Sequence, residues 1–152
     1  MILKRVVVTG LGALTPIGNT LPDYWEGLRS GKSGAAPITH FDASKYKTRF
    51  ACEIKNFDIG NFMDRKEARK MDPFAQYAMV AVDEAIIDSN LPLAALDPDR
   101  VGVIWGSGIG GLLTFQEEVK SYARGDGTPR FNPFFIPKMI PDLSAGHISI
   151  KY

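Results

Sequence analysis

The sequence has few of the residues from which metal centres and cross-linked scaffolds are built. Its 152 residues include one Cys and two His, which excludes an internal disulfide framework and a Cys-rich zinc module. The two His also lack the spacing of a metal site, so we expect no bound metal. Neither sign of charge is in excess, because 18 Lys and Arg residues stand against 17 Asp and Glu residues. This balance gives no overall attraction to nucleic acid or to an anionic membrane.

Long apolar runs are lacking too. No run approaches the roughly 20 residues of a membrane-spanning helix, and the first residues lack the apolar region and cleavage site of a signal peptide. The apolar content of 45% and the charged content of 23% are close to the average for globular domains. The sequence therefore predicts one soluble, cytoplasmic domain with a real core and no membrane span.

Short apolar runs alternate with helical patterns along the chain. Val6–Val8 and Arg100–Trp105 are apolar on both faces, which is typical of buried parallel strands. Asp72 is a good N-cap and Pro73 suits a first helical turn, so a helix is predicted over 73–88. Strands that alternate with helices favour an α/β layered fold. We also expect a helix with Pro22 near its start, a strand at 50–54, a helical turn at 65–71, a helix at 112–123 and helical pieces within 134–150.

Two glycine-rich segments follow the predicted strands. Gly10 and Gly12 resemble the start of a dinucleotide fingerprint, but the third glycine is replaced by Thr15. Pro16 then disfavours helical geometry at Thr15, so nucleotide binding is a disfavoured alternative. The second segment, Gly106–Gly111, lies between a predicted strand and a predicted helix. It suits an anion cradle, a close approach of backbone to a ligand, or a tight turn.

The residues alone show no complete catalytic set. Cys52 lies in an apolar candidate strand and is predicted to be buried and inert, and His147 to be a hydrogen-bonded structural residue. Four cations lie within six residues at Arg65, Lys66, Arg69 and Lys70. On a helix, Lys66 would share a face with Arg69 and Lys70. The cluster suits either a solvated face or a docking patch for an acidic partner.

Several segments in order along the chain resemble the N-terminal portion of a β-ketoacyl-acyl-carrier-protein synthase, most closely the type II condensing enzymes of fatty-acid elongation. The similarity is collinear over nearly the whole chain, and it is carried by Arg5–Gly12, Thr15–Asn19, Ser30–Gly34, His40–Asp42, Arg65–Asp72, Gly106–Gly111, Asn132–Pro137 and Ala145–His147.

The resemblance implies a homodimer with a thiolase-like αβαβα layered fold, of which residues 1–152 would be the incomplete N-terminal half. In the family reaction, an acyl chain moves from acyl carrier protein to an active-site Cys. Decarboxylation of malonyl-carrier protein then gives a carbanion that attacks the acyl thioester. No cofactor is implied beyond the phosphopantetheine arm that the carrier protein delivers. The partners implied are acyl carrier protein and fatty acyl and malonyl thioesters.

The residues that perform this chemistry in the family have no counterpart in the sequence. Cys52 does not align with the nucleophile, and His40 and His147 do not align with the catalytic His pair. We therefore assign no catalytic residue in this chain. The nucleophile-bearing segment and the C-terminal domain are expected to lie outside it, and residues 1–152 alone are expected to be inactive.

Supporting residues do match. Ile109 matches the residue that gates the acyl pocket, and Phe135, Ile136 and Met139 match positions that line its deep end. Their apolar side chains suit an alkyl chain. Lys66, Arg69 and Lys70 match the patch that docks the acidic carrier protein. A second hypothesis is a non-catalytic subunit that sets chain length in a ketosynthase heterodimer, which would lack Cys at the nucleophile position.

Overall fold

The computed structural model describes residues 4–152, which form two compact units. One unit comprises the chain up to Phe57 together with Ala81–Leu91, and the other comprises Asp58–Val80 together with Pro92–Tyr152. Helix α3 (Pro73–Ser89) contributes its first half to the second unit and its second half to the first unit. The sequence predicted a single domain, and α3 is one continuous helix across the change of unit between Val80 and Ala81.

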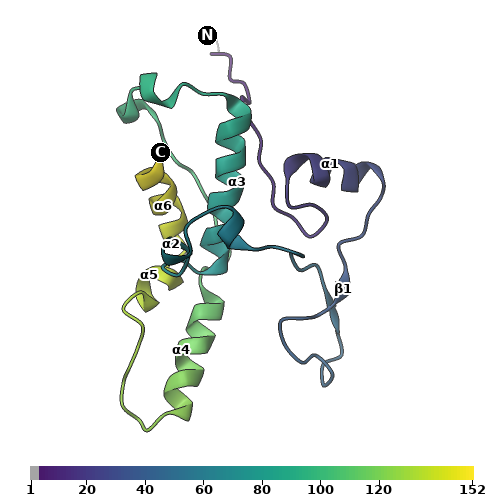
Figure 1. The fold of residues 1–152 in the computed structure, drawn as a ribbon, viewed down its shortest axis with the longest axis vertical. Coiled ribbons are helices and arrows are strands. Elements are labelled where there is room, and N and C mark those ends of the chain that lie inside the picture. The colour runs from purple at the N-terminus through teal and green to yellow at the C-terminus, as the bar shows by residue number, and fades with distance from the viewer. Residues whose placement is uncertain (1–3) are drawn as a thin grey trace. The chain divides into compact units, whose positions relative to one another are not determined.

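The first unit contains helix α1 (Leu21–Arg29) and a short antiparallel pair, β1 (Ala36–Pro37) with β2 (Phe50–Ala51) (Figure 1). Thr20 caps α1 by accepting a hydrogen bond from the Asp23 amide, and Gly31 takes the positive φ of +67° that follows the helix. The strand predicted at 50–54 is reduced to the two residues of β2. In the observed register, residues 52–54 would lie opposite residues 33–35, which form no strand.

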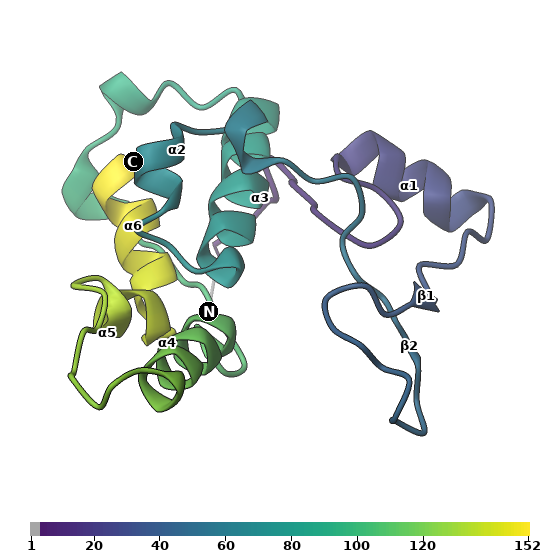
Figure 2. The same cartoon turned by 60° about the horizontal axis from the view of Figure 1, so that its bottom comes forward.

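The second unit is helical. It contains α2 (Arg65–Ala68), the first half of α3, α4 (Leu112–Arg124), α5 (Phe135–Met139) and α6 (Leu143–Lys151). Figure 2 shows α5 beside α4. Three short 3-10 helices complete this unit, at Ile59–Asn61, Leu93–Ala95 and Pro98–Arg100. Its buried apolar side chains come from α2, α3, α6 and the connection between α2 and α3: Ala68, Met71, Ala75, Ala78, Met79, Val80 and Ile148.

The predicted helices are confirmed, with changed ends. The helix expected at 73–88 is α3, the helix expected at 112–123 is α4, and the pieces expected within 134–150 are α5 and α6. The helix expected with Pro22 near its start is α1, which begins at Leu21. The basic turn expected at 65–71 is helical only as far as Ala68. No helix in the described part of the chain is long and apolar enough to cross a membrane.

The two predicted buried strands are wrong for this structure. Val6–Val8 and Arg100–Trp105 contain no strand; Val6 is 90% exposed and Ile104 is fully exposed. A strand must pair its N–H and C=O groups with a neighbour. Within residues 4–152 the only paired strands are β1 and β2, apart from the isolated bridge between Thr15 and Gly18. The apolar pattern of these segments therefore marks surfaces that this structure leaves uncovered.

Candidate functional site

The basic patch Lys66, Arg69 and Lys70 lies at α2 and the turn that follows it. Asp64 caps α2 by accepting hydrogen bonds from the Lys66 amide at 2.7 Å and the Glu67 amide at 3.4 Å. Arg69 is already the C-cap, so the predicted common helical face does not extend to Lys70. Lys70 Nζ instead pairs with Glu67 at 2.7 Å.

The cations of this region differ in how far they are neutralised. Arg65 pairs with Asp58 at 2.9 Å, just as Lys70 pairs with Glu67. Lys66 and Arg69 are exposed and form no ion pair with any residue of the described chain. Two of the three predicted patch residues therefore keep a free charge that can attract an acidic partner.

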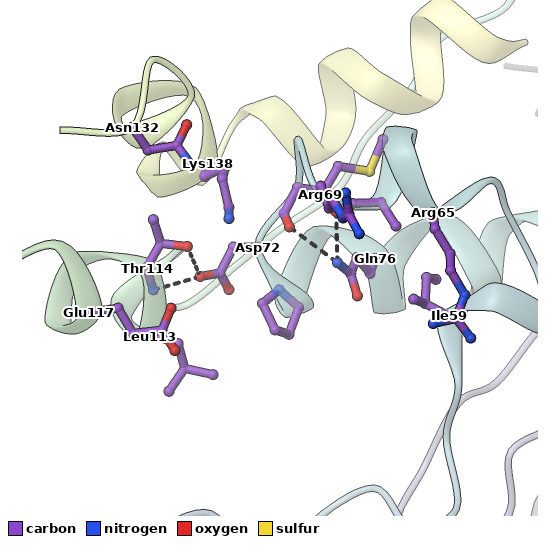
Figure 3. A pocket seen from close by; sticks show the side chains of 13 residues that line it. Ile59, Arg65, Arg69, Asp72, Gln76, Leu113, Thr114, Glu117, Asn132 and Lys138 are labelled. Carbon is purple, nitrogen blue, oxygen red and sulfur yellow. Dashed lines mark hydrogen bonds between the residues drawn. The ribbon is translucent and has the colours of Figure 1, made fainter. Parts of the chain in front are cut away.

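A cavity of about 480 Å³ opens beside this patch, between α2, the start of α3, and α4 (Figure 3). Basic side chains from Arg65, Arg69 and Lys138 line it together with the carboxylates of Asp72 and Glu117. Its mixed charges do not define a site for one anion, and it contains none of the predicted acyl-pocket residues.

The most connected side chain in this cavity is Asp72, which is 2% exposed. Its Oδ2 accepts hydrogen bonds from the Thr114 amide at 2.9 Å and from Thr114 Oγ1 at 2.6 Å (Figure 3). Its Oδ1 accepts a longer bond of 3.3 Å from the Phe74 amide. The predicted N-cap role of Asp72 is thus confirmed. The bond to Thr114 was not predicted, because 42 residues separate the two side chains in sequence.

The predicted acyl-pocket residues lie on α5 and on the glycine-rich loop at 106–111. Phe135, Ile136 and Met139 belong to α5, and the Gly111 amide donates a 3.0 Å hydrogen bond to the Met139 carbonyl. A Cβ atom at Gly110 would lie 2.4 Å from that same carbonyl oxygen. The glycines therefore permit a close approach of this loop to α5.

The side chains of these four residues have different surroundings. Phe135 stacks on Phe115 of α4 and on Phe131, with ring centroids 6.3 Å and 5.6 Å apart. Ile109 is 69% exposed and Ile136 is also exposed. The structure brings the loop and α5 together, and it leaves the two isoleucine side chains available for further contacts.

The glycines of the first loop pack on a helix. A Cβ atom at Gly12 would lie 1.9 Å from the Ala81 carbonyl oxygen of α3, and one at Gly10 would lie 2.2 Å from that of Ala85. The amides of Leu11 and Ala13 donate to the carboxylates of Asp88 and Glu84, each at 2.8 Å. Glu84 also accepts from the Leu21 amide at 2.6 Å. These carboxylates occupy the amides that a dinucleotide phosphate would need.

The remaining titratable candidates show no catalytic arrangement. Cys52 is exposed, so its predicted burial is wrong; the strand expected to contain it ends at Ala51. Burial lowers the pKa of His147 on α6, while the nearby Glu67 carboxylate opposes that shift. His40 is exposed. In residues 4–152, no group of three or more His, Cys, Asp and Glu side chains could hold a metal ion.

Comparison with known proteins identifies the relatives of this chain. Residues 3–152 match the family model described as beta-ketoacyl synthase, N-terminal domain. A 3-oxoacyl-(acyl-carrier-protein) synthase 2 from Synechocystis sp. is 49% identical over 148 residues, which is 97% of this chain and 35% of that protein. The enzyme of the same name from Staphylococcus aureus is 47% identical over 147 residues, again 97% of this chain and 35% of the relative.

Two solved structures share the fold. One is described as a type II PKS acyl-carrier protein in complex with its ketosynthase bound to the hexaketide. It superposes with a TM-score of 0.79 at 29% identity, covering 99% of this chain and 39% of the other. The other is the ishigamide ketosynthase/chain length factor, with a TM-score of 0.77 at 27% identity, covering 95% and 36%.

The resemblance seen in the sequence is thus confirmed over nearly its whole length. The chain spans about a third of the length of the curated relatives that it matches. Its backbone follows the corresponding part of the thiolase-like fold of the ketosynthases, which confirms the predicted α/β fold class. The chain belongs to the β-ketoacyl synthase family, whose N-terminal-domain model it matches over residues 3–152.

Proposed function

We propose that this chain is the N-terminal portion of a 3-oxoacyl-(acyl-carrier-protein) synthase of fatty-acid elongation. The observation that carries this proposal is the identity of 49% over 97% of the chain with a protein of that name. The reaction has two steps. A thiol of the complete enzyme displaces the carrier-protein thiol from an acyl thioester. Malonyl-carrier protein then loses CO₂, and the resulting carbanion attacks the acyl-enzyme and releases the thiolate.

In this proposal the chain supplies supporting residues. The nucleophile and the residues that assist decarboxylation belong to segments outside residues 1–152. Ile109 gates the acyl chain, and Phe135, Ile136 and Met139 line the end of its pocket. Contact between Gly111 and Met139 supports this grouping. Each methylene of the acyl chain that these side chains bury contributes about 0.8 kcal/mol.

The patch Lys66, Arg69 and Lys70 is proposed to dock acyl carrier protein. Lys66 and Arg69 support this role, because both are exposed and without an ion-pair partner in the described residues. One solved relative is a ketosynthase in complex with an acyl-carrier protein. The phosphopantetheine arm would arrive with the carrier, so the proposal includes no cofactor of the enzyme. We further propose that the enzyme is a homodimer in the cytoplasm.

The first test is the intact mass of the protein from its source, with peptide mapping beyond Tyr152. We expect a mass well above the 16.7 kDa of 152 residues and a peptide with a Cys shortly after the present sequence. Incubation with acyl carrier protein that bears a radiolabelled acyl chain should then transfer the label to that Cys. A full-length protein that takes no label and condenses no substrate would overturn the proposal.

A second candidate function is a non-catalytic subunit that sets chain length beside an active ketosynthase. The solved ketosynthase/chain length factor favours keeping this candidate, at 27% identity. The two functions differ at the nucleophile position beyond Tyr152. A Gln or another non-nucleophilic residue there, with no acyl labelling, would support the partner subunit.

A further inference from the structure

One buried carboxylate connects two helix N-termini of the second unit. Asp72 precedes α3 and accepts from the Phe74 amide at 3.3 Å. The same carboxylate accepts from the Thr114 amide at 2.9 Å, in the first turn of α4. The N-cap of α4 is Gly111, which offers no side-chain acceptor. Asp72 therefore performs for α4 the capping that a Ser, Thr or Asp at Gly111 would otherwise perform.

The chemistry of this contact makes it a strong restraint. A carboxylate that accepts two hydrogen bonds near a helix N-terminus is favoured by charge and by the helix dipole. Asp72 is 2% exposed and Thr114 is 5% exposed, so the bond between them is largely shielded from bulk solvent. A buried polar group left without its partner destabilises the folded arrangement around it.

Asp72 lies next to the basic patch in sequence. Asp72 follows Lys70 by two residues, and the Gln76 side chain fixes the intervening turn. Its amide donates to the Ala68 carbonyl at 2.9 Å and to the Met71 carbonyl at 3.2 Å (Figure 3). The end of α2 and the start of α3 are therefore held as one corner.

Thr114 lies next to the glycine-rich loop at 106–111 in sequence. Thr114 follows Gly111 by three residues, and Gly111 also donates to the Met139 carbonyl of α5 at 3.0 Å. The C-terminal end of the loop is thus held between Asp72 and α5. Ile109 lies two residues before Gly111 and is 69% exposed, so its position depends on where this end of the loop is held.

We infer that Asp72 and Thr114 are positioning residues that hold the loop carrying Ile109 in register with α5, and thereby set the acyl-chain preference of the enzyme. This inference deepens the proposed function and rests on it. Neither residue needs to touch the acyl chain. Their effect passes through the start of α4 and through Gly111.

The test uses the full-length protein and three variants. Thr114→Val removes the hydroxyl but keeps the shape and the amide donor, and Thr114→Ser restores the hydroxyl. The matched control is Thr39→Val, because Thr39 likewise donates its amide at 3.0 Å and its hydroxyl at 2.7 Å to one oxygen of Glu53, but at an exposed site. The readouts are kcat/KM for long and short acyl-carrier substrates, and hydrogen exchange of the amides at 106–114.

We expect Thr114→Val to change the long-to-short ratio of kcat/KM at least threefold and to speed exchange of the loop amides about tenfold. Thr114→Ser and Thr39→Val should leave the ratio at the wild-type value. A loss of folded enzyme lowers both rates equally, so it does not move the ratio. An unchanged ratio in Thr114→Val overturns the inference, whatever happens to exchange.

The failure of this inference can be told apart from the failure of the proposed function. A wild-type enzyme that condenses no acyl chain overturns the proposed function, whereas the exchange measurement still tests whether Asp72 and Thr114 hold the loop.

If Thr114→Val does not fold, Asp72→Asn replaces it. This variant keeps a carbonyl acceptor but loses the charge, and the same ratio decides the outcome.

Discussion

At the scale of single residues, two glycines and two carboxylates show what the nucleotide-like motif does in this fold. Gly12 has no room for a side chain against the Ala81 carbonyl, and the amides beside it are taken by Glu84 and Asp88. The spacing Gly-x-Gly after an apolar run thus arises here from packing of a loop on α3. A short glycine motif needs the third glycine and a free helix N-terminus before it indicates a phosphate.

Gly12→Ala tests this packing. A new Cβ atom only 1.9 Å from the Ala81 carbonyl oxygen must displace backbone, so we expect a loss of about 2–3 kcal/mol in the free energy of unfolding. The matched control is Gly146→Ala in α6, where the nearest atom would be Leu143 Cδ2 at 3.7 Å. That change should be neutral or stabilising by up to about 1 kcal/mol. Urea unfolding of the full-length variants measures both, and equal midpoints would contradict the packing argument.

Glu84→Gln tests the carboxylate that accepts from two loop amides. The wild-type side chain uses one oxygen for Ala13 and the other for Leu21, at 2.8 Å and 2.6 Å. An amide keeps only one acceptor oxygen and places a donor against the other N–H. We expect a loss of about 1–3 kcal/mol. Glu26→Gln is the control, because Glu26 forms only an exposed pair with Arg29 at 3.8 Å; it should change stability by less than about 0.5 kcal/mol.

At the scale of elements, α2 shows how a short helix can separate free from neutralised cations. The ion pair with Glu67 removes much of the charge of Lys70, while Lys66 and Arg69 remain available. We therefore expect the double variant Lys66→Ala and Arg69→Ala to lower kcat/KM for carrier-protein substrates about tenfold at low salt. The effect should fade as ionic strength rises, because exposed charges are screened.

The single variant Lys70→Ala provides the contrast for this patch. Because Glu67 already pairs with Lys70, the loss of the Lys70 side chain should lower kcat/KM by less than the loss of either Lys66 or Arg69. Lys47→Ala, in the exposed connection between β1 and β2, controls for a general loss of positive charge. Steady-state rates at several salt concentrations measure the series. A Lys70 effect as large as that of the double variant would contradict the distinction.

Helix α6 contributes a pH-dependent element. Burial lowers the pKa of His147 below its ordinary value of 6.5, so the folded state binds this proton less readily than the unfolded state. As pH falls below 6.5, the unfolded state gains the proton first, and the free energy of unfolding decreases until pH reaches the folded pKa. We expect His147→Gln to remove this part of the pH dependence. The resonance that this variant loses should titrate below pH 6.5 by NMR, and a titration above 6.5 would contradict the burial argument.

At the scale of the whole molecule, exposed apolar segments decide how the isolated polypeptide is expected to behave in solution. Val6–Val8 and Ile104 are uncovered and unpaired in residues 4–152. Such surfaces drive aggregation when nothing covers them. We expect the isolated polypeptide 1–152 to be aggregated or molten, with strong ANS binding and no cooperative melt. The full-length protein is the control. A monomeric 1–152 with a sharp thermal transition would show that these segments need no further partner.

Local sequence information predicted where the helices lie, though not all of their ends, because a helix pairs its own backbone groups and shows its period within a few turns. Asp72 with Pro73 marked the start of α3, and the apolar spacing marked its extent. The collinear motifs likewise predicted the family that the family model confirms. The same local reasoning failed for Val6–Val8 and for Cys52, because strand pairing and burial depend on what lies beside a segment in space.

The sequence by itself determined the family, the helices and the candidate residues of the acyl and carrier-protein sites. Tertiary structure alone decided the contacts around these sites. Gly111 hydrogen-bonds Met139, and Asp72 hydrogen-bonds Thr114, which is 42 residues away in sequence. Lys70 forms an ion pair, whereas Lys66 and Arg69 form none in the described residues. Helices form from contacts three and four residues apart, which a sequence displays directly. A capping bond between distant residues depends on how the chain folds back on itself, and no local pattern records it.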